Sequence, residues 1–123
     1  MKRLMKKRTK EFAKNIIKLC RRLPGNREGN LIANEIFRYA TSVAANCRAA
    51  CKARSKAESI SKLSIAEEKA DETLFWLELM KEVQIVDNTL LDSLMNENDE
   101  IIAIIVSSIR TSSKREQTTE AKI

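Results

Sequence analysis

The 123-residue sequence contains no histidine. Without an imidazole, the chain cannot build a His-dependent metal centre, a histidine base or a Ser-His-Asp triad. Residues that form turns are also scarce, with two glycines and one proline. Because a sandwich or barrel of many strands needs a turn about every ten residues, the composition excludes these folds. It also removes many classes of enzyme.

Cysteines and long apolar runs are equally few. The three cysteines are an odd number, which indicates free thiols and a reducing, cytoplasmic setting. The longest apolar run, from Ile101 to Val106, is far shorter than the roughly 20 residues that a membrane-spanning helix needs. The basic start of the chain resembles the beginning of a signal peptide, but no apolar segment follows it. We therefore expect a cytoplasmic protein that does not enter a membrane.

The chain is rich in charge and in residues that favour helices. Charged residues make up 33% of it, and the net charge is +6. Residues 1–22 hold ten Lys and Arg against one acid, and residues 48–62 hold five against one. Residues 67–100 reverse this balance, with eleven acids against two lysines. Either opposite faces attract each other within the fold, or the basic segments form a surface that binds nucleic acid.

Apolar spacing predicts four amphipathic helices. Pro24 ends the first helix. Ser55, with Glu58 three residues later, has the pattern of a capping box at the start of the third helix. Asp87 or Asn88 is the expected cap of the fourth. The predicted helices cover residues 9–23, 30–53, 56–83 and 89–115.

Each predicted helix carries one apolar stripe, as expected for a bundle. The stripes include Phe12, Ile16 and Leu19, then Ile36, Val43 and Cys47, then Leu63, Ala70 and Leu77, and finally Leu91, Asn98 and Ile105. Ala33, Phe37, Ala44 and Cys51 are expected to widen the stripe of the second helix. Further apolar residues of the third and fourth helices, such as Trp76 and Val106, lie outside the stripes and indicate self-association.

These elements predict an all-α protein with a single domain. Four amphipathic helices joined by short connections are typical of an antiparallel, up-down-up-down four-helix bundle, here over residues 9–115. We expect residues 1–8 to form a basic N-terminal arm or an extra turn. Residues 116–123 are expected to form a polar, disordered tail.

Three segments of the sequence also carry a resemblance to a known family. They are TSVAAN, RAACKARSKAE and ADETLFWLEL, at residues 41–46, 48–58 and 70–79. From about Lys10 to Lys114, the chain resembles the four-helix-bundle proteins of the 23S rRNA intervening-sequence type. The resemblance implies the bundle fold and supplies no catalytic residues. Similar proteins are accessory subunits of diversity-generating retroelements, so it also implies a homopentamer that binds RNA or DNA and a reverse transcriptase or other protein partner.

Two positions depart from the family pattern. Cys47 stands where an aromatic residue is expected, and Ser59 stands where phenylalanine is expected. Both changes shrink or polarise a place that should be packed. Either the bundle is looser near the second loop, which joins the second and third predicted helices, or Phe75 and Trp76 fill the space.

Basic residues around the second loop are the main candidates for nucleic-acid binding. Lys and Arg without interleaved aromatics suit contacts with phosphates, which give affinity but little sequence information. Alternatively, Arg48 and Arg54 pair with the glutamates of residues 67–72. The candidate set is Arg38, Arg48, Lys52, Arg54, Lys56 and Lys62, together with Lys6, Lys7 and Arg8 of the basic arm, which also holds Lys10.

Four polar residues are expected to lie between helices. Ser42 and Asn46 are one turn apart on the second helix, and Glu72 and Trp76 are one turn apart on the third. Beside small alanines, they indicate buried interhelical hydrogen bonds that fix the register of the helices. A catalytic reading makes Glu72 a base near Ser42, but without histidine or a metal this reading is much the weaker.

No cofactor or metal is expected. Cys47 and Cys51 share a helix face, but with no other Cys or His near them in sequence they are expected to be buried small side chains. The acidic cluster of residues 67–72 lacks the histidines that di-iron bundles use.

The residues and the resemblance together predict a non-enzymatic, oligomeric protein that binds nucleic acid through phosphates. Its expected role is that of an accessory factor of an RNA or reverse-transcriptase element. The alternative is a protein-interaction scaffold with no direct role in nucleic-acid binding. The basic arm has no aromatic residue before Phe12, which disfavours insertion into a membrane.

Overall fold

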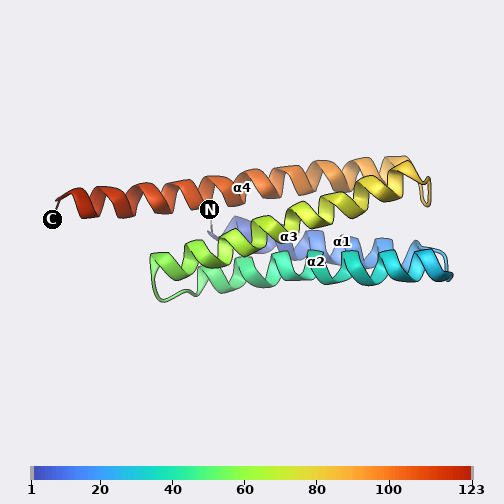
Figure 1. Cartoon of the computed structure of the whole chain (residues 1–123), viewed down its shortest axis with the longest axis horizontal. Helices are drawn as coiled ribbons and strands as arrows, with labels where there is room; N and C mark the ends of the chain where they lie inside the picture. Colours follow the sequence, from blue (N-terminus) through green and yellow to red (C-terminus); the bar gives the residue numbers. More distant parts are fainter. Residues whose placement is uncertain (1, 123) are drawn as a thin grey trace.

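The computed structural model describes the backbone of residues 2–122 and the side chains of residues 2–113. Its four helices run antiparallel in chain order, and α1 closes the bundle against α4 (Figure 1). The prediction of an all-α, up-down-up-down four-helix bundle in a single domain is confirmed. The helices are α1 (Lys2–Arg22), α2 (Arg27–Cys51), α3 (Lys56–Glu82) and α4 (Asn88–Lys122).

The connection between α1 and α2 is tight. Asn26 caps α2, and its side chain accepts a hydrogen bond from the Gly29 N–H at 2.8 Å. A Cβ atom at Gly29 would lie 1.9 Å from the carbonyl oxygen of Pro24, so this close approach requires glycine. The cap starts α2 at Arg27, three residues before the predicted start.

The predicted cap of α3 is confirmed. The Ser55 hydroxyl accepts a hydrogen bond from the Glu58 N–H at 3.1 Å. In return, the Glu58 carboxylate accepts a hydrogen bond from the Arg54 N–H at 3.2 Å. This reciprocal pattern satisfies N–H groups that a helix start leaves free. The two hydrogen bonds hold the second loop. They also occupy the carboxylate of Glu58, the one acid among residues 48–62.

The turn between α3 and α4 forms at the predicted break. Gln84 adopts a left-handed conformation with φ of 55°, and the Ile85 N–H donates to the Met80 carbonyl at 3.2 Å. Both features are typical of a helix C-terminus. The Asp87 carboxylate accepts a hydrogen bond from the Thr89 N–H at 3.2 Å, so Asp87 is the cap of α4.

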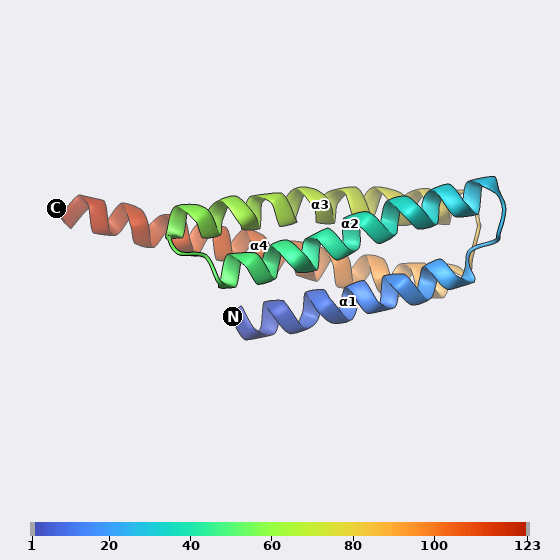
Figure 2. The same ribbon diagram turned by 90° about the horizontal axis from the view of Figure 1, so that it is seen from below.

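The basic N-terminal residues belong to the bundle. α1 begins at Lys2, and Met5 and Thr9 are buried at 3% and 1% exposure. Residues 2–8 therefore extend the first helix and are not a separate arm. At the other end, the backbone of α4 passes beyond the ends of the other helices (Figure 2). The fourth helix was predicted to end at residue 115, whereas the backbone of α4 continues to Lys122. The expected separate tail from residue 116 is therefore not seen in the described backbone, which continues the helix there.

The core follows the predicted stripes. Alanines at 40, 66 and 70 are fully buried, and they give α2 and α3 room to pack closely. Each large apolar side chain removed from water stabilises the fold by about 1.5–3 kcal/mol. The largest fully buried apolar side chains are Phe12, Ile16, Leu19, Ile36, Leu77, Met80, Leu91, Ile101 and Ile105.

Asn98 is an incompletely paired polar residue within this core. Its side chain is fully buried, and its amide donates to the Ala70 carbonyl at 3.0 Å across the α3–α4 contact. Its side-chain oxygen has no hydrogen-bond partner among the described residues. An unpaired buried oxygen costs about 1–3 kcal/mol, so Asn98 lowers the stability of the bundle.

We predict that Asn98→Leu raises the free energy of unfolding by about 1 kcal/mol, because leucine has the same branching at Cγ and buries no polar atom. Urea denaturation followed by circular dichroism measures the change. The control is Leu94→Ala, which creates a cavity and should lower the same quantity by about 2–5 kcal/mol. A lower stability for Asn98→Leu would mean that the bond to Ala70 outweighs the unpaired oxygen.

Candidate nucleic-acid interface

The basic segments meet at one end of the bundle. α1 begins and α2 ends there, and the Cys51 thiol lies 3.8 Å from the Lys2 carbonyl oxygen. At the other end of this helix pair, the Cys20 thiol lies 3.5 Å from the Ala33 carbonyl oxygen. α1 and α2 thus run side by side along their whole shared length (Figure 2).

These two contacts define which residues lie along the line where α1 and α2 meet, called here the α1–α2 groove. Side chains three or four positions apart lie on the same side of a helix. On α1, the row of side chains spaced in this way runs from Lys2 through Lys6 and Lys10 to Cys20. On α2, the corresponding row runs from Cys51 through Arg48 to Ala33. Both rows are free of acidic residues. We call Lys6, Lys10, Arg48 and Lys52 the basic face.

The basic face is exposed and unpaired. All four of its members are solvent-exposed, as are Arg54 and Lys56 of the adjoining loop. Within the described side chains, ion pairs form only at Arg8, Lys14, Arg38, Lys69 and Lys81. The expected alternative, pairing of Arg48 and Arg54 with the glutamates of α3, is not seen in this part of the chain. These cations remain available to an external anion.

Arg8 has a different role from the other basic candidates. Its guanidinium forms two hydrogen bonds with the Glu97 carboxylate, at 3.0 and 2.9 Å, and also contacts Glu100. These bonds raise the pKa of Arg8 above its usual value and join α1 to α4. Because its donors are already engaged, we assign Arg8 to the stability of the bundle.

Arg38 also lies apart from the basic face. It pairs with Glu35 at 2.7 Å, and its guanidinium lies 5.0 Å from the centre of the Tyr39 ring. Along α2 it is about 15 Å from Arg48 at 1.5 Å per residue. Lys69 of α3 approaches the same ring at 5.4 Å.

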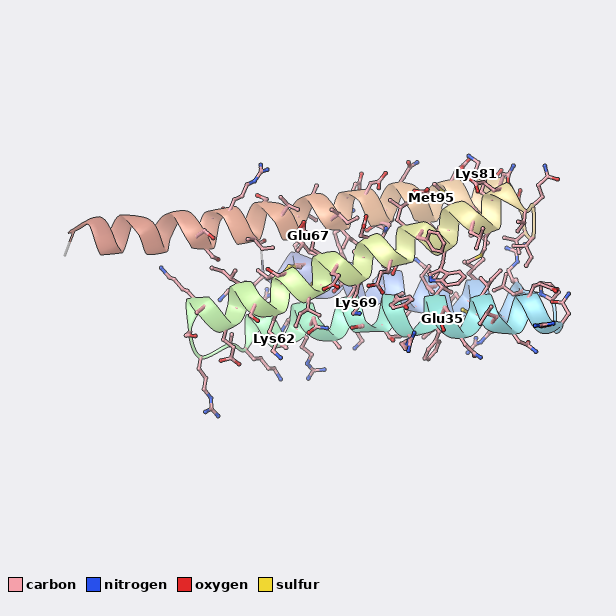
Figure 3. All side chains as sticks on the ribbon, in the orientation of Figure 1. Glu35, Lys62, Glu67, Lys69, Lys81 and Met95 are labelled. Atoms are coloured by element: carbon pink, nitrogen blue, oxygen red, sulfur yellow. The ribbon has the colours of Figure 1, made fainter. Side chains whose placement is uncertain are left out.

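The two remaining candidates are Lys7 of α1 and Lys62 near the start of α3. Lys7 is exposed, but helical spacing turns it away from the row that contains Lys6. Lys62 is half-buried on the side of α3 that faces α2, and Glu67 points toward α4 (Figure 3). The structure therefore groups Lys6, Lys62 and the residues of the second loop near one end.

The four polar residues expected between helices bond within their own helices. The Asn46 amide donates to the Ser42 carbonyl at 2.9 Å and to its hydroxyl at 3.1 Å. Glu72 pairs with Lys69 at 3.7 Å, and Trp76 packs edge to face against Phe75. Among the described residues the predicted interhelical bonds do not form. Asn98, predicted only as a member of the core stripe, makes the buried polar contact between helices.

The two positions that depart from the family pattern have different surroundings. Cys47 is fully buried, and Ser59 lines a small hollow of about 50 Å³ together with Cys51. Phe75 is 56% exposed and lies over four turns further along α3, so it does not fill this space. Filling of the space by Phe75 is therefore excluded, and looser packing near the second loop stays a prediction.

The buried thiol of Cys47 is chemically inert at neutral pH. Burial, followed by the neighbouring Cys51 thiol, raises the pKa of Cys47 to about 12. Burial also raises the pKa of Cys20. Among the described residues, no three Cys, Asp or Glu side chains gather as a metal site would require. Cys47 is buried, as the sequence predicts, whereas Cys51 is half-buried.

We predict that Cys47 is the slowest of the three cysteines to react with iodoacetamide in the folded protein. At pH 8, a pKa of about 12 leaves about one thiol in ten thousand as the reactive thiolate. Mass spectrometry of digests taken over time gives the three rates. The control is the same reaction in urea, because unfolding should make the three rates similar. Equal rates without urea would contradict the burial of Cys47.

An acidic and apolar surface lies on the opposite side of the molecule. An open hollow of about 740 Å³ runs along α4, where Ile102, Val106 and Ile109 provide apolar side chains. Ile102 also borders a second hollow with acidic residues of α3, among them Glu67 and Asp71. The sequence indicated extra apolar residues here but not the hollow, because that depends on how far α4 lies from α3.

The arrangement defines a class: a single-domain antiparallel four-helix bundle with a basic face on α1 and α2 and an acidic, apolar hollow on α3 and α4. None of the described helices is long and apolar enough to cross a membrane. The chain matches the 23S rRNA-intervening sequence protein family over residues 2–107, and it belongs to that family.

A solved structure supports this assignment. The chain is similar to the crystal structure of a protein of unknown function from the S23 ribosomal protein family of Bacteroides thetaiotaomicron. The two share 34% identity with a TM-score of 0.81, over 85% of this chain and 97% of the other. No curated protein matches the chain. The resemblance inferred from the sequence is confirmed, and the function has to be argued from the surface.

Proposed function

We propose that this protein is a non-enzymatic nucleic-acid-binding protein that contacts phosphates through its basic face and second loop. One observation carries the proposal: Lys6, Lys10, Arg48, Lys52 and Arg54 are exposed, and none of them forms an ion pair among the described residues. A polyanion gains favourable contacts there and displaces no internal ion pair. Its bound counterions are released, which drives the association.

Phosphate contacts of this kind position a nucleic acid without reading its sequence. The family name associates relatives with intervening sequences of 23S rRNA, which supports RNA as a ligand. A role as accessory factor of an RNA or reverse-transcriptase element fits a binding protein of this kind. The capped loop supports it further, because Ser55 and Glu58 hold Arg54 and Lys56 in place before binding.

We predict that the triple variant Arg48→Ala/Lys52→Ala/Arg54→Ala binds a labelled structured RNA at least tenfold more weakly than the wild type at moderate salt. Each lost phosphate contact should also reduce the slope of log affinity against log salt, by about 0.9. Fluorescence anisotropy at several salt concentrations measures both quantities.

A matched control separates the basic face from net charge. Arg21, Arg22 and Arg27 are exposed at the opposite end of the bundle, and their replacement by alanine removes the same charge. This second triple variant should bind nearly as the wild type does. Equal losses in both variants, or none in either, would contradict the proposed interface.

We further propose that the protein assembles into a homo-oligomer, for which the family resemblance favours a pentamer. The hollow along α4 supports this, because Ile102 and Val106 present apolar surface that a second copy would cover. The hollow also favours the scaffold alternative, in which another protein occupies it. The basic face lies on other helices and would stay open in either case.

We predict that the purified protein has a mass in solution several times 14.0 kDa, and that Val106→Glu reduces it. A carboxylate between Ile102 and Ile109 opposes contact with a second copy, because it would have to lose its hydration there. Multi-angle light scattering gives the mass. Leu31→Glu is the control, since Leu31 is exposed on α2, away from the hollow. A wild-type monomer at high concentration would contradict the assembly.

A further inference from the structure

One exposed aromatic residue lies in the row of α2 that borders α1. Phe37 is 46% exposed, although the sequence suggested that it widens the core. It belongs to the same row as Arg48, which runs from Ala33 to Cys51 along the α1–α2 groove. An exposed phenylalanine within a surface free of carboxylates has no evident role in folding.

The surroundings of Phe37 leave its ring open. The neighbouring positions of its row are Ala33 and Thr41, which are too small to cover a phenyl ring. The Thr41 hydroxyl donates to the Phe37 carbonyl at 2.7 Å, so it is turned back onto its own helix. Across the groove, the register of the two contacts places Ile17 beside Phe37, and Ile17 is half-buried.

The cations of the basic face lie between the Phe37 ring and the second loop, along the line where α1 and α2 meet. Arg48 is eleven positions further along α2, about 16 Å away at 1.5 Å per residue. Lys10 and Lys6 follow on α1, successively closer to the second loop. A strand laid along the contact between α1 and α2 would therefore meet the aromatic ring first and a line of positive charges next.

We propose that the nucleic acid bound by the basic face is single-stranded, and that Phe37 stacks with one of its unpaired bases. The inference rests on the proposed phosphate-binding function and names its substrate class. Aromatic side chains combined with a positively charged groove are how proteins bind single strands without sequence preference. In a duplex the bases are stacked on each other, so a ring on a helix surface cannot reach them.

Phe75 provides an internal comparison. It is 56% exposed, slightly more than Phe37, and it lies on α3. Its neighbours one turn away along α3 are Asp71, Glu72 and Glu78, which repel phosphates. If exposure of an aromatic ring were sufficient, Phe75 would serve equally well. Of these two phenylalanines, the proposal assigns stacking to Phe37, because only Phe37 shares a surface with the unpaired cations of the basic face.

The test compares Phe37→Leu with Phe75→Leu on two probes, a labelled oligothymidine and a labelled DNA duplex of the same length. Phe37→Leu should weaken binding to oligothymidine about tenfold and leave binding to the duplex unchanged. Phe75→Leu should change neither. Phe37→Trp should keep the wild-type affinity for oligothymidine, because an indole also stacks. Unchanged duplex binding shows that Phe37→Leu is folded.

The outcomes separate this inference from the function on which it rests. If Phe37→Leu binds oligothymidine as the wild type does, while the basic triple variant loses it, the stacking inference is wrong and the phosphate-binding function stands. A wild type that binds neither probe would overturn both. If Phe37→Leu lost the same affinity for oligothymidine and for the duplex, the variant would be damaged in its fold. Stacking would then be rejected, unless Phe37→Trp bound oligothymidine as tightly as the wild type does.

Discussion

The antiparallel packing of α1 against α2 determines which charges of this chain meet. The contacts of Cys51 with Lys2 and of Cys20 with Ala33 hold the two helices in one register over their shared length. In this register the cations of the first helix lie beside those at the end of the second. The buried faces of both helices carry apolar residues, so the charged rows are left at the edge of the groove. A slip of one helix turn would move Lys6 away from Arg48 by about 5.4 Å.

The charge pattern then divides the molecule into two functional sides. Where acids and bases approach each other, as in Arg8 with Glu97, they form ion pairs between helices and contribute to the fold. The rows of α1 and α2 that lie along the contact between these helices hold no acid among the described residues, so their positive potential is suited to attract polyanions. On α3 and α4 the acids border an apolar hollow, a surface suited to a protein neighbour. The proposed nucleic-acid binding and the proposed assembly therefore use different helices.

Local patterns in the sequence predicted the helices, the Ser55 cap and most of the core, because these depend on spacing within a few turns. Features set by distant residues were not predictable. Arg8 looked like a phosphate ligand, since its partner Glu97 lies 89 positions away in the chain. Helical spacing places Phe37 at the margin of the core stripe, and only the position of α1 decides that its ring is exposed. The same holds for Asn98, whose unpaired oxygen depends on which atoms α3 brings next to it.

The central claim is that the α1–α2 side, and not the α3–α4 side, faces the nucleic acid. Lysine acetylation footprinting tests it directly, because one experiment reports on both sides of the folded wild-type protein. With a saturating single-stranded oligonucleotide, the account predicts that Lys6, Lys10 and Lys52 become protected. Lys69 and Lys81, which lie away from the basic face, should react as in the free protein. Protection of Lys69 and Lys81 with continued reactivity of Lys6, Lys10 and Lys52 would contradict it.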